Sequence, residues 1–161
     1  MPGLKPLFAL AALAVATAGA AAKDERATPY WASISAGQAL MRTGPGRNYP
    51  ATWLYRRADL PVKVVETYPD WRKVEDPGGE TGWMLQRLLS DTRTAIVTTQ
   101  APAAMREKPD GASRVAFEAE RGVVGRVSKC GGGWCLLDVG GRKGFIKVDQ
   151  VWGVDPNEAV D

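Results

Sequence analysis

Residues 40–50 read Leu-Met-Arg-Thr-Gly-Pro-Gly-Arg-Asn-Tyr-Pro and carry more information about the fold than any other segment. Gly44 and Gly46 stand on either side of Pro45, and this combination lets a long loop double back on itself without steric cost. Met41 is apolar and is expected to face inward, so the next side chain, that of Arg42, should point outward at the base of the loop. The segment therefore predicts a long loop that leaves and re-enters a β structure.

The residues after this loop alternate between apolar and polar side chains, as strands with one buried face do. Leu60, Val62 and Val64 are apolar at every second position. The expected elements are a strand at 60–65, a turn at 68–70, a strand at 71–75, a hairpin loop at 76–80 and a strand from residue 82. Eighteen glycines and eleven prolines interrupt these short runs, and this pattern is typical of small all-β barrels or sandwiches.

The same order of residues recurs about 63 positions downstream. The matching positions are Met41-Arg42 with Met105-Arg106, Trp71 with Trp134, Val74 with Leu137, and Gly82-Trp83 with Gly144-Phe145. The offset changes only inside loops, because strands tolerate insertions less well than turns do. The sequence thus predicts two copies of one β module, with a linker at residues 90–99 and a second copy that begins near residues 95–97.

The composition excludes several classes of function. The chain has no histidine and two cysteines, which removes Ser-His-Asp and Cys-His catalytic systems and closed zinc sites. Its 21 Lys and Arg against 18 Asp and Glu give a formal net charge of +3, and the basic residues are scattered rather than gathered on one segment. We expect no metal, no other cofactor and no nucleic-acid partner.

The N-terminal residues have the features of a targeting signal. Lys5 precedes residues 7–22, which carry no charge, are shorter than the ~20 residues of a membrane-spanning helix and end in small side chains. Residues 1–22 therefore predict a signal peptide that is cleaved after Ala20 or Ala22, with an uncleaved anchor as the alternative. We expect a periplasmic or secreted protein that is not stably inserted in the membrane after cleavage.

Export changes the expected state of the cysteines. Cys130 and Cys135 enclose a glycine-rich turn between two apolar runs, and opposed residues of an antiparallel pair approach closely enough for a disulfide. In an oxidising compartment we expect them to be bonded to each other. A redox-active pair is the alternative, but the spacing is not Cys-x-x-Cys and no helix follows that would lower a thiol pKa.

The first loop and the residues that follow it resemble the bacterial SH3-like domains. Residues 40–50 fit the pattern hydrophobic-x-R-x-G-P-x-x-x-Y-P, while Trp71, Val74 and Gly82-Trp83 fit its second half. The resemblance implies five-stranded, partly open barrels that are exported, often associated with the cell wall, and not catalytic. It implies a first domain at residues 30–92, a second and degenerate domain at 95–154, and a tail at 155–161.

The resemblance also implies a shallow binding groove beside the first loop. The candidate ligand-binding residues are Arg42, Arg47, Tyr49, Tyr68, Asp70 and Trp71. Aromatic side chains with a polar rim suit contacts to peptides or sugars. The alternative for Tyr49 and Trp71 is that they cap a small core. We expect Trp83 and Trp134 in the core. Trp53 and Tyr55 would form a second exposed patch if Leu54, which lies between them, faces inward.

These observations favour a non-catalytic binding module for a cell-wall peptide or an envelope protein. Two alternatives stay open: a structural domain that docks on one periplasmic protein, and a glycan hydrolase that uses paired carboxylates, although no such pair is recognisable. The loop at residues 108–111 is expected to be shorter than its first-copy counterpart, so the binding surface should lie on the first copy. The second copy should pack against the first through Phe145 or Trp152.

Overall fold

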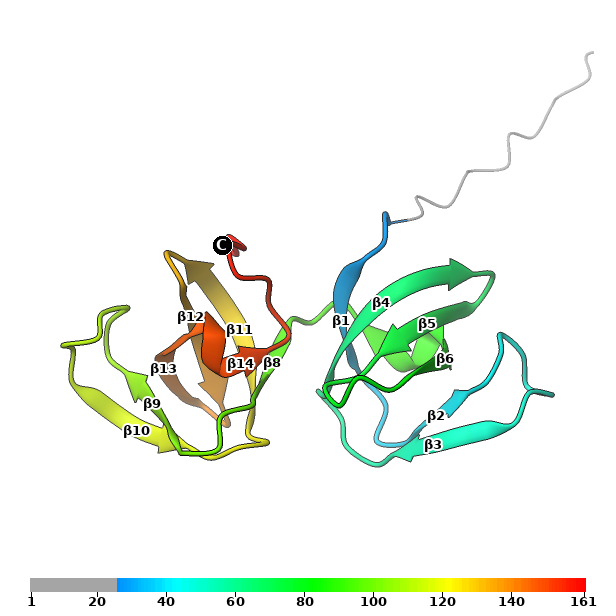
Figure 1. Cartoon of the computed structure of the whole chain (residues 1–161), viewed down its shortest axis with the longest axis horizontal. Coiled ribbons are helices and arrows are strands. Elements are labelled where there is room, and N and C mark those ends of the chain that lie inside the picture. Colours follow the sequence, from blue (N-terminus) through cyan, green and yellow to red (C-terminus); the bar gives the residue numbers. More distant parts are fainter. Residues whose placement is uncertain (1–25) are drawn as a thin grey trace, which may run out of the picture.

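The computed structural model describes residues 26–161, and the expected signal peptide at residues 1–22 lies outside the described residues. Figure 1 shows two β barrels that lie side by side along the long axis of the molecule, the first drawn from blue to green and the second from green to red. Among the described residues, no helix has the length and apolar character needed to cross a membrane.

The first barrel is a seven-stranded antiparallel sheet that curls around one core. Its strands are β1 (Tyr30–Ile34), β2 (Ala39–Arg42), β3 (Ala51–Tyr55), β4 (Pro61–Tyr68), β5 (Trp71–Glu75), β6 (Thr81–Leu85) and β7 (Leu89–Ser90). A short 3-10 helix, η1 (Gln86–Leu88), connects the last two strands. The strand order is β3-β2-β6-β5-β4-β1-β7.

The second barrel repeats this arrangement strand for strand. Its elements are β8 (Thr94–Val97), β9 (Ala103–Arg106), β10 (Val115–Ala119), β11 (Val124–Gly131), β12 (Trp134–Val139), β13 (Arg142–Lys147), η2 (Val148–Gln150) and β14 (Val151–Trp152). The strand order β10-β9-β13-β12-β11-β8-β14 is that of the first barrel with seven added to every number. The predicted all-β fold and its internal duplication are therefore confirmed.

Each sheet has seven strands where the resemblance implies five. The additional pair in the first barrel is β2 and β3, the two arms of the hairpin that carries the long first loop, which are joined through Leu40 opposite Leu54. In the second barrel β9 and β10 play the same part. The long loop is therefore the tip of a paired hairpin.

The alternating residues bury one face of each strand. Val62 and Val64 of β4 and Val74 of β5 are fully buried in the core of the first barrel. Leu137 of β12 and Ile146 of β13 occupy the core of the second. Full burial of such side chains contributes about 1.5–3 kcal/mol each, so these small cores depend on few residues.

A glycine in each barrel allows two strands to cross closely. A Cβ atom on Gly82 would lie 2.5 Å from Cγ of Met41, and one on Gly144 would lie 2.7 Å from Cβ of Met105. Any side chain at these positions would displace the buried methionine of the neighbouring hairpin. In each barrel the glycine of the Gly-aromatic pair therefore packs against the methionine of the Met-Arg pair.

The two long loops have the same length, so the expectation of a shorter second loop is wrong. Residues 43–50 and 107–114 connect equivalent strands. Their backbone hydrogen bonds correspond: Thr43 N donates to Pro50 O at 3.1 Å, and Glu107 N donates to Arg114 O at 3.0 Å. Backbone bonding maintains the loop although the second copy lacks the glycines and tyrosine of the first.

The second barrel is fastened at its end by a disulfide and by the C-terminal segment. Cys130 and Cys135 form the expected disulfide across the β11–β12 hairpin. Val160 exchanges backbone hydrogen bonds of 2.9 and 3.2 Å with Cys130, so residues beyond β14 return to the sheet. Glu158 accepts two hydrogen bonds from the guanidinium of Arg93, at 2.5 and 2.8 Å.

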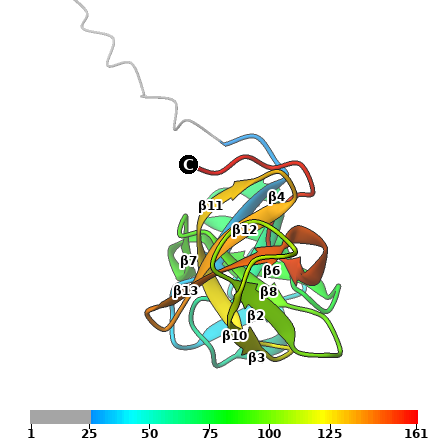
Figure 2. The same ribbon diagram turned by 90° about the vertical axis from the view of Figure 1, so that its left-hand side faces the viewer.

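The barrels contact each other through an aromatic pair. Trp31 of β1 and Trp152 of β14 meet edge to face with ring centroids 4.7 Å apart, which places Trp152 in the interface as expected. Lys63 lies over the Trp31 ring at 4.9 Å and pairs with Asp155 at 3.6 Å. Arg57 Nη1 donates to Gly122 O at 2.8 Å. Figure 2 views the pair end-on, with the second barrel in front.

Candidate functional site

A groove crosses one face of the first barrel, and it consists of two adjoining hollows. The larger, of about 690 Å³, is lined by Asp70, Trp71, Arg72, Gln86, Ser90 and Asp91 among others. The smaller, of about 390 Å³, is lined by Leu40, Leu54, Leu88 and Arg42 among others. Arg47, Trp71, Leu85 and Arg87 line both hollows. We call the whole surface the Trp71 groove.

Trp71 forms the floor where the two hollows meet. It is the first residue of β5 and lies opposite Leu85 of β6. Its side chain is 7% exposed, yet Trp71 lies outside the core cluster formed around Val62, Val64 and Val74. Both readings of this residue were open from the sequence, and the structure makes it a buried groove residue rather than a member of the main core.

The turn before Trp71 is held firmly in place. Asp70 has a positive φ of 61°, and its carbonyl oxygen accepts a hydrogen bond of 2.9 Å from the backbone N–H of Gln86. Asp and Asn adopt this left-handed conformation more readily than most residues. The bond ties the β4–β5 turn to η1, and so joins two walls of the groove.

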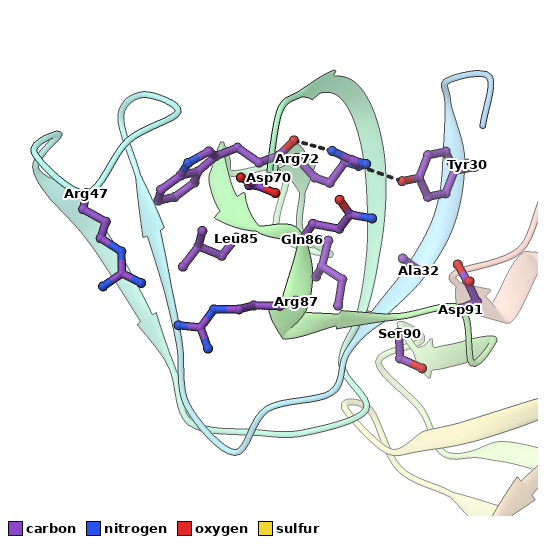
Figure 3. Close-up of a pocket in the computed structure, with 12 residues that line it drawn as sticks. Tyr30, Ala32, Arg47, Asp70, Arg72, Leu85, Gln86, Arg87, Ser90 and Asp91 are labelled. Carbon is purple, nitrogen blue, oxygen red and sulfur yellow. Dashed lines mark hydrogen bonds between the residues drawn. The ribbon is translucent and has the colours of Figure 1, made fainter. Parts of the chain in front are cut away.

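Arg72 serves as an internal brace. Its Nη1 donates to the carbonyl oxygens of Trp71 at 2.7 Å and Tyr68 at 3.0 Å, and its Nε donates to the hydroxyl of Tyr30 at 3.3 Å. Figure 3 shows the arginine between the β4–β5 turn and β1. The groove therefore has a fixed wall before any ligand arrives.

Arg42 points outward at the base of the loop, as expected. Its Nη1 donates to the carbonyl oxygen of Tyr49 at 2.7 Å. Arg106 Nη1 makes the same bond to the carbonyl oxygen of Ser113 in the second barrel. The recurring arginine is therefore a clamp that holds the loop closed, and in the first barrel it also lines the smaller hollow.

The two tyrosines predicted beside the groove line neither hollow. The ring of Tyr49 lies on its own loop, where a Cβ atom on Gly44 would stand 2.4 Å from the ring. Tyr68 is 52% exposed and meets Trp83 edge to face with ring centroids 6.3 Å apart. Of the six candidate residues, the structure brings Arg42, Arg47, Asp70 and Trp71 together and leaves Tyr49 and Tyr68 outside.

Trp53 and Tyr55 do not form a shared exposed patch, because its condition, an inward-facing Leu54, is not met. Tyr55 is buried and its hydroxyl donates to a carboxylate oxygen of Asp76 at 2.8 Å, whereas Leu54 is 37% exposed. Burial, together with this hydrogen bond, raises the pKa of Tyr55 well above its ordinary value of 10.0. The face that carries Tyr55 packs on the core, so Leu54 lies on the opposite face of the hairpin and lines the groove.

Sequence reasoning missed the apolar half of the groove. Its side chains are Leu40, Leu54, Leu85 and Leu88, which we call the leucine slot. Leu40 and Leu54 are both more than one-third exposed and lie directly opposite each other on β2 and β3. An exposed pair of leucines is unusual beside a polar rim, and it becomes recognisable only when the hairpin register is known.

The second barrel has a smaller hollow in the corresponding place. It measures about 380 Å³ and is lined by Trp134, Lys147, Asp149 and Val154 among others. Trp134 is half-buried with Lys147 Nζ 5.9 Å from the ring centroid, so the expectation that it lies in the core is wrong. Trp83, by contrast, is buried as expected. Lys147 and Asp149 take the places of Leu85 and Arg87.

Three solved structures are similar to this chain in outline. NlpC2 from Trichomonas vaginalis is 17% identical, with 80% of this chain and 51% of that chain covered and a TM-score of 0.36. NlpC1 from the same organism is 15% identical, with 79% of this chain and 46% of that chain covered and a TM-score of 0.35. An NlpC/P60 family protein from Bacillus cereus is 14% identical, with 76% of this chain and 56% of that chain covered and a TM-score of 0.35. This chain thus spans about half the length of each. No curated protein matches the sequence.

The family comparison covers most of both barrels. The family described as the bacterial SH3 domain matches residues 35–91 and 99–153, together more than half of the chain. The two segments contain the two loop clamps, the two Gly-aromatic contacts and both Trp71 and Trp134. The chain therefore belongs to the bacterial SH3 domain family and carries two tandem copies of the domain.

Proposed function

We propose that this chain is a non-catalytic binding module of the cell envelope that holds peptides of the cell wall in the Trp71 groove. The observation that carries the proposal is the groove itself: an aromatic floor, an aliphatic slot and a rim of both charges on one face of the first barrel. Such surfaces bind short peptides, because rigid apolar contacts supply free energy and a few polar groups fix orientation.

The charges favour a peptide over an acidic polymer. The carboxylates of Asp70 and Asp91 share the larger hollow with the guanidinium groups of Arg47, Arg72 and Arg87. A mixed rim suits a ligand with both signs of charge, as peptides with free amino and carboxyl groups have, whereas an acidic polymer would leave the two carboxylates without a partner of opposite charge. Export of the chain, which this role requires, is part of the proposal.

Co-sedimentation with purified wall sacculi tests the proposal. Trp71→Ala should lower the affinity by about 1–3 kcal/mol, the usual cost of truncating an aromatic anchor. Because Trp71 is buried, circular dichroism must show that this variant is folded. Leu54→Asp provides a second variant at an exposed position in the groove, and it should weaken binding through loss of the apolar contact.

Trp53→Ala is the matched control. Trp53 is 58% exposed, adjacent to Leu54 in the sequence and outside both hollows. It should leave sedimentation unchanged. If folded Trp71→Ala and Leu54→Asp variants sediment like the unaltered protein, the groove is not the wall-binding surface. If a particular envelope protein, and not the wall, is retained through these residues, the module is an adaptor instead.

A further inference from the structure

The protein uses only some of the arginines around the Trp71 groove for its own structure. Arg42 is bonded to Tyr49 O and Arg72 to three oxygen atoms. Within residues 26–161, neither Arg47 nor Arg87 donates a side-chain hydrogen bond or forms an ion pair. Both side chains are exposed, so their guanidinium groups remain available to a ligand.

These two arginines come from different walls of the groove. Arg47 lies in the first loop and Arg87 in η1, and each lines both hollows. Figure 3 shows their guanidinium groups at the same end of the larger hollow, with Tyr30 and Asp91 at the other end. The leucine slot adjoins that same end, because Leu40, Leu54 and Leu88 line the hollow that Arg47 and Arg87 share.

The end of the groove that holds Arg47, Arg87 and the leucine slot combines two kinds of binding group. A guanidinium group presents planar, paired N–H donors that match the two oxygens of a carboxylate, and the pairing is stronger than a bond between neutral groups. The leucine slot beside it offers apolar area to an aliphatic group. A ligand that satisfies both features carries a carboxylate directly next to an aliphatic side chain.

We infer that the Trp71 groove selects peptides with a free carboxylate beside an aliphatic side chain, with the carboxylate between Arg47 and Arg87 and the side chain in the leucine slot. This inference rests on the proposed function and adds the direction of the bound peptide. The carboxylate end lies toward the first loop, and the amino end lies toward Asp91.

A titration with two forms of one ligand tests the inference. The probes are muropeptides, the disaccharide-linked peptides that a muramidase releases from sacculi, and the same muropeptides after conversion of their carboxyl groups to carboxamides. The unaltered mature chain should bind the carboxamides roughly tenfold more weakly. The double variant Arg47→Gln with Arg87→Gln should bind the free peptides roughly tenfold more weakly, and conversion to carboxamides should then cost nothing further.

Arg56→Gln is the control for loss of one positive charge. Arg56 is exposed and lies outside both hollows, so this variant should bind as the unaltered protein does. Equal binding of free and amidated peptides would overturn the inference and leave the proposed function intact. Absence of binding to either form would overturn both. Arginine-dependent binding of heparin without binding of the peptides would identify a polyanion surface and contradict the inference.

Discussion

Arg42 and Tyr49 are joined across the base of the first loop by a hydrogen bond of 2.7 Å from Nη1 to the carbonyl oxygen. Arg106 and Ser113 repeat the bond in the second barrel, although Ser113 has a small side chain where Tyr49 has an aromatic ring. The arginine therefore bonds to a backbone carbonyl oxygen in both barrels, and the clamp requires the arginine but no particular side chain on the loop. This explains why the Met-Arg pair recurs in a copy that has lost the glycines and the tyrosine of the first loop.

Removing the clamp should open the loop. Arg42→Gln is expected to lower the free energy of unfolding by about 1 kcal/mol, because the charged donor to the carbonyl oxygen of Tyr49 is lost. Amide exchange at Thr43, which is bonded across the same loop, should accelerate. Arg47→Gln, in the same loop but without an internal bond, should change neither quantity. Equal effects of the two variants would show that Arg42 does not clamp the loop.

The contact between the barrels should appear as a coupling energy. Trp31 and Trp152 meet edge to face, and such pairs contribute about 0.5–1.5 kcal/mol beyond their burial. A double-mutant cycle with Trp31→Ala and Trp152→Ala, followed by chemical denaturation, should give about 1 kcal/mol. Trp134, whose ring lies beside Lys147, is the control partner for Trp31 in a second double-mutant cycle. Trp31→Ala and Trp134→Ala should be additive, and additivity in the first cycle would contradict the interface.

Acid should release the C-terminal segment. The hydrogen bonds from Arg93 hold the pKa of Glu158 below its ordinary value of 4.5, against the opposing effect of burial. The carboxylate is thus favoured in the folded state, and its contribution is present above that ordinary value and lost as pH falls through the lowered one. Glu158→Gln should cost about 1–2 kcal/mol at pH 7.

The free energy of unfolding of the unaltered protein and that of the Glu158→Gln variant, both measured by urea denaturation, should therefore become equal as the pH falls below 4.5. Glu107→Gln is a suitable comparison, because Glu107 forms a longer contact of 3.6 Å with a largely exposed arginine, Arg114. It should have little effect at either pH. A Glu158→Gln difference that is the same at pH 7 and in acid would show that the ion pair does not hold the segment.

The disulfide should stabilise the second barrel locally. Replacement of Cys130 and Cys135 by serine is expected to cost about 2 kcal/mol through the added freedom of the unfolded chain. Val160 is bonded to the Cys130 backbone, so amide exchange at Val160 should also accelerate. Ligand binding by the first barrel should be unchanged. Two reactive thiols in protein recovered from the periplasm would contradict the bond itself.

The strands and the duplication were predictable because they depend on local patterns. Alternation at Val62 and Val64 and the glycine-rich turns require no knowledge of distant residues. The length of the second loop was misjudged, because side-chain identity differs while backbone bonding does not. The face of Leu54 could not be predicted, since the pattern of β3 cannot show which side of the hairpin faces the core.

The site could be predicted only where its residues belong to a local sequence pattern. Trp71, Asp70, Arg42 and Arg47 lie near one another in sequence or in the loop pattern, and the structure brings them together. The leucine slot is assembled from residues of the β2–β3 hairpin, of β6 and of η1, and the hairpin is distant in sequence from the other two. Its leucines resemble core residues until their exposure is known. Arg87 likewise becomes a candidate binding residue only when the structure shows that it lines the same hollows as Arg47.

Chemical-shift mapping on uniformly ¹⁵N-labelled protein of residues 23–161 tests the central claim most directly, because it needs no substitution. Muropeptides released from sacculi by a muramidase are added stepwise while the backbone and indole signals are followed. Binding in the Trp71 groove should cause saturable shifts of the Trp71 indole and of the amides of Arg47, Leu85 and Arg87, while the indole signal of Trp53 stays unchanged. Saturable shifts confined to the second barrel, or to Trp53, would contradict it.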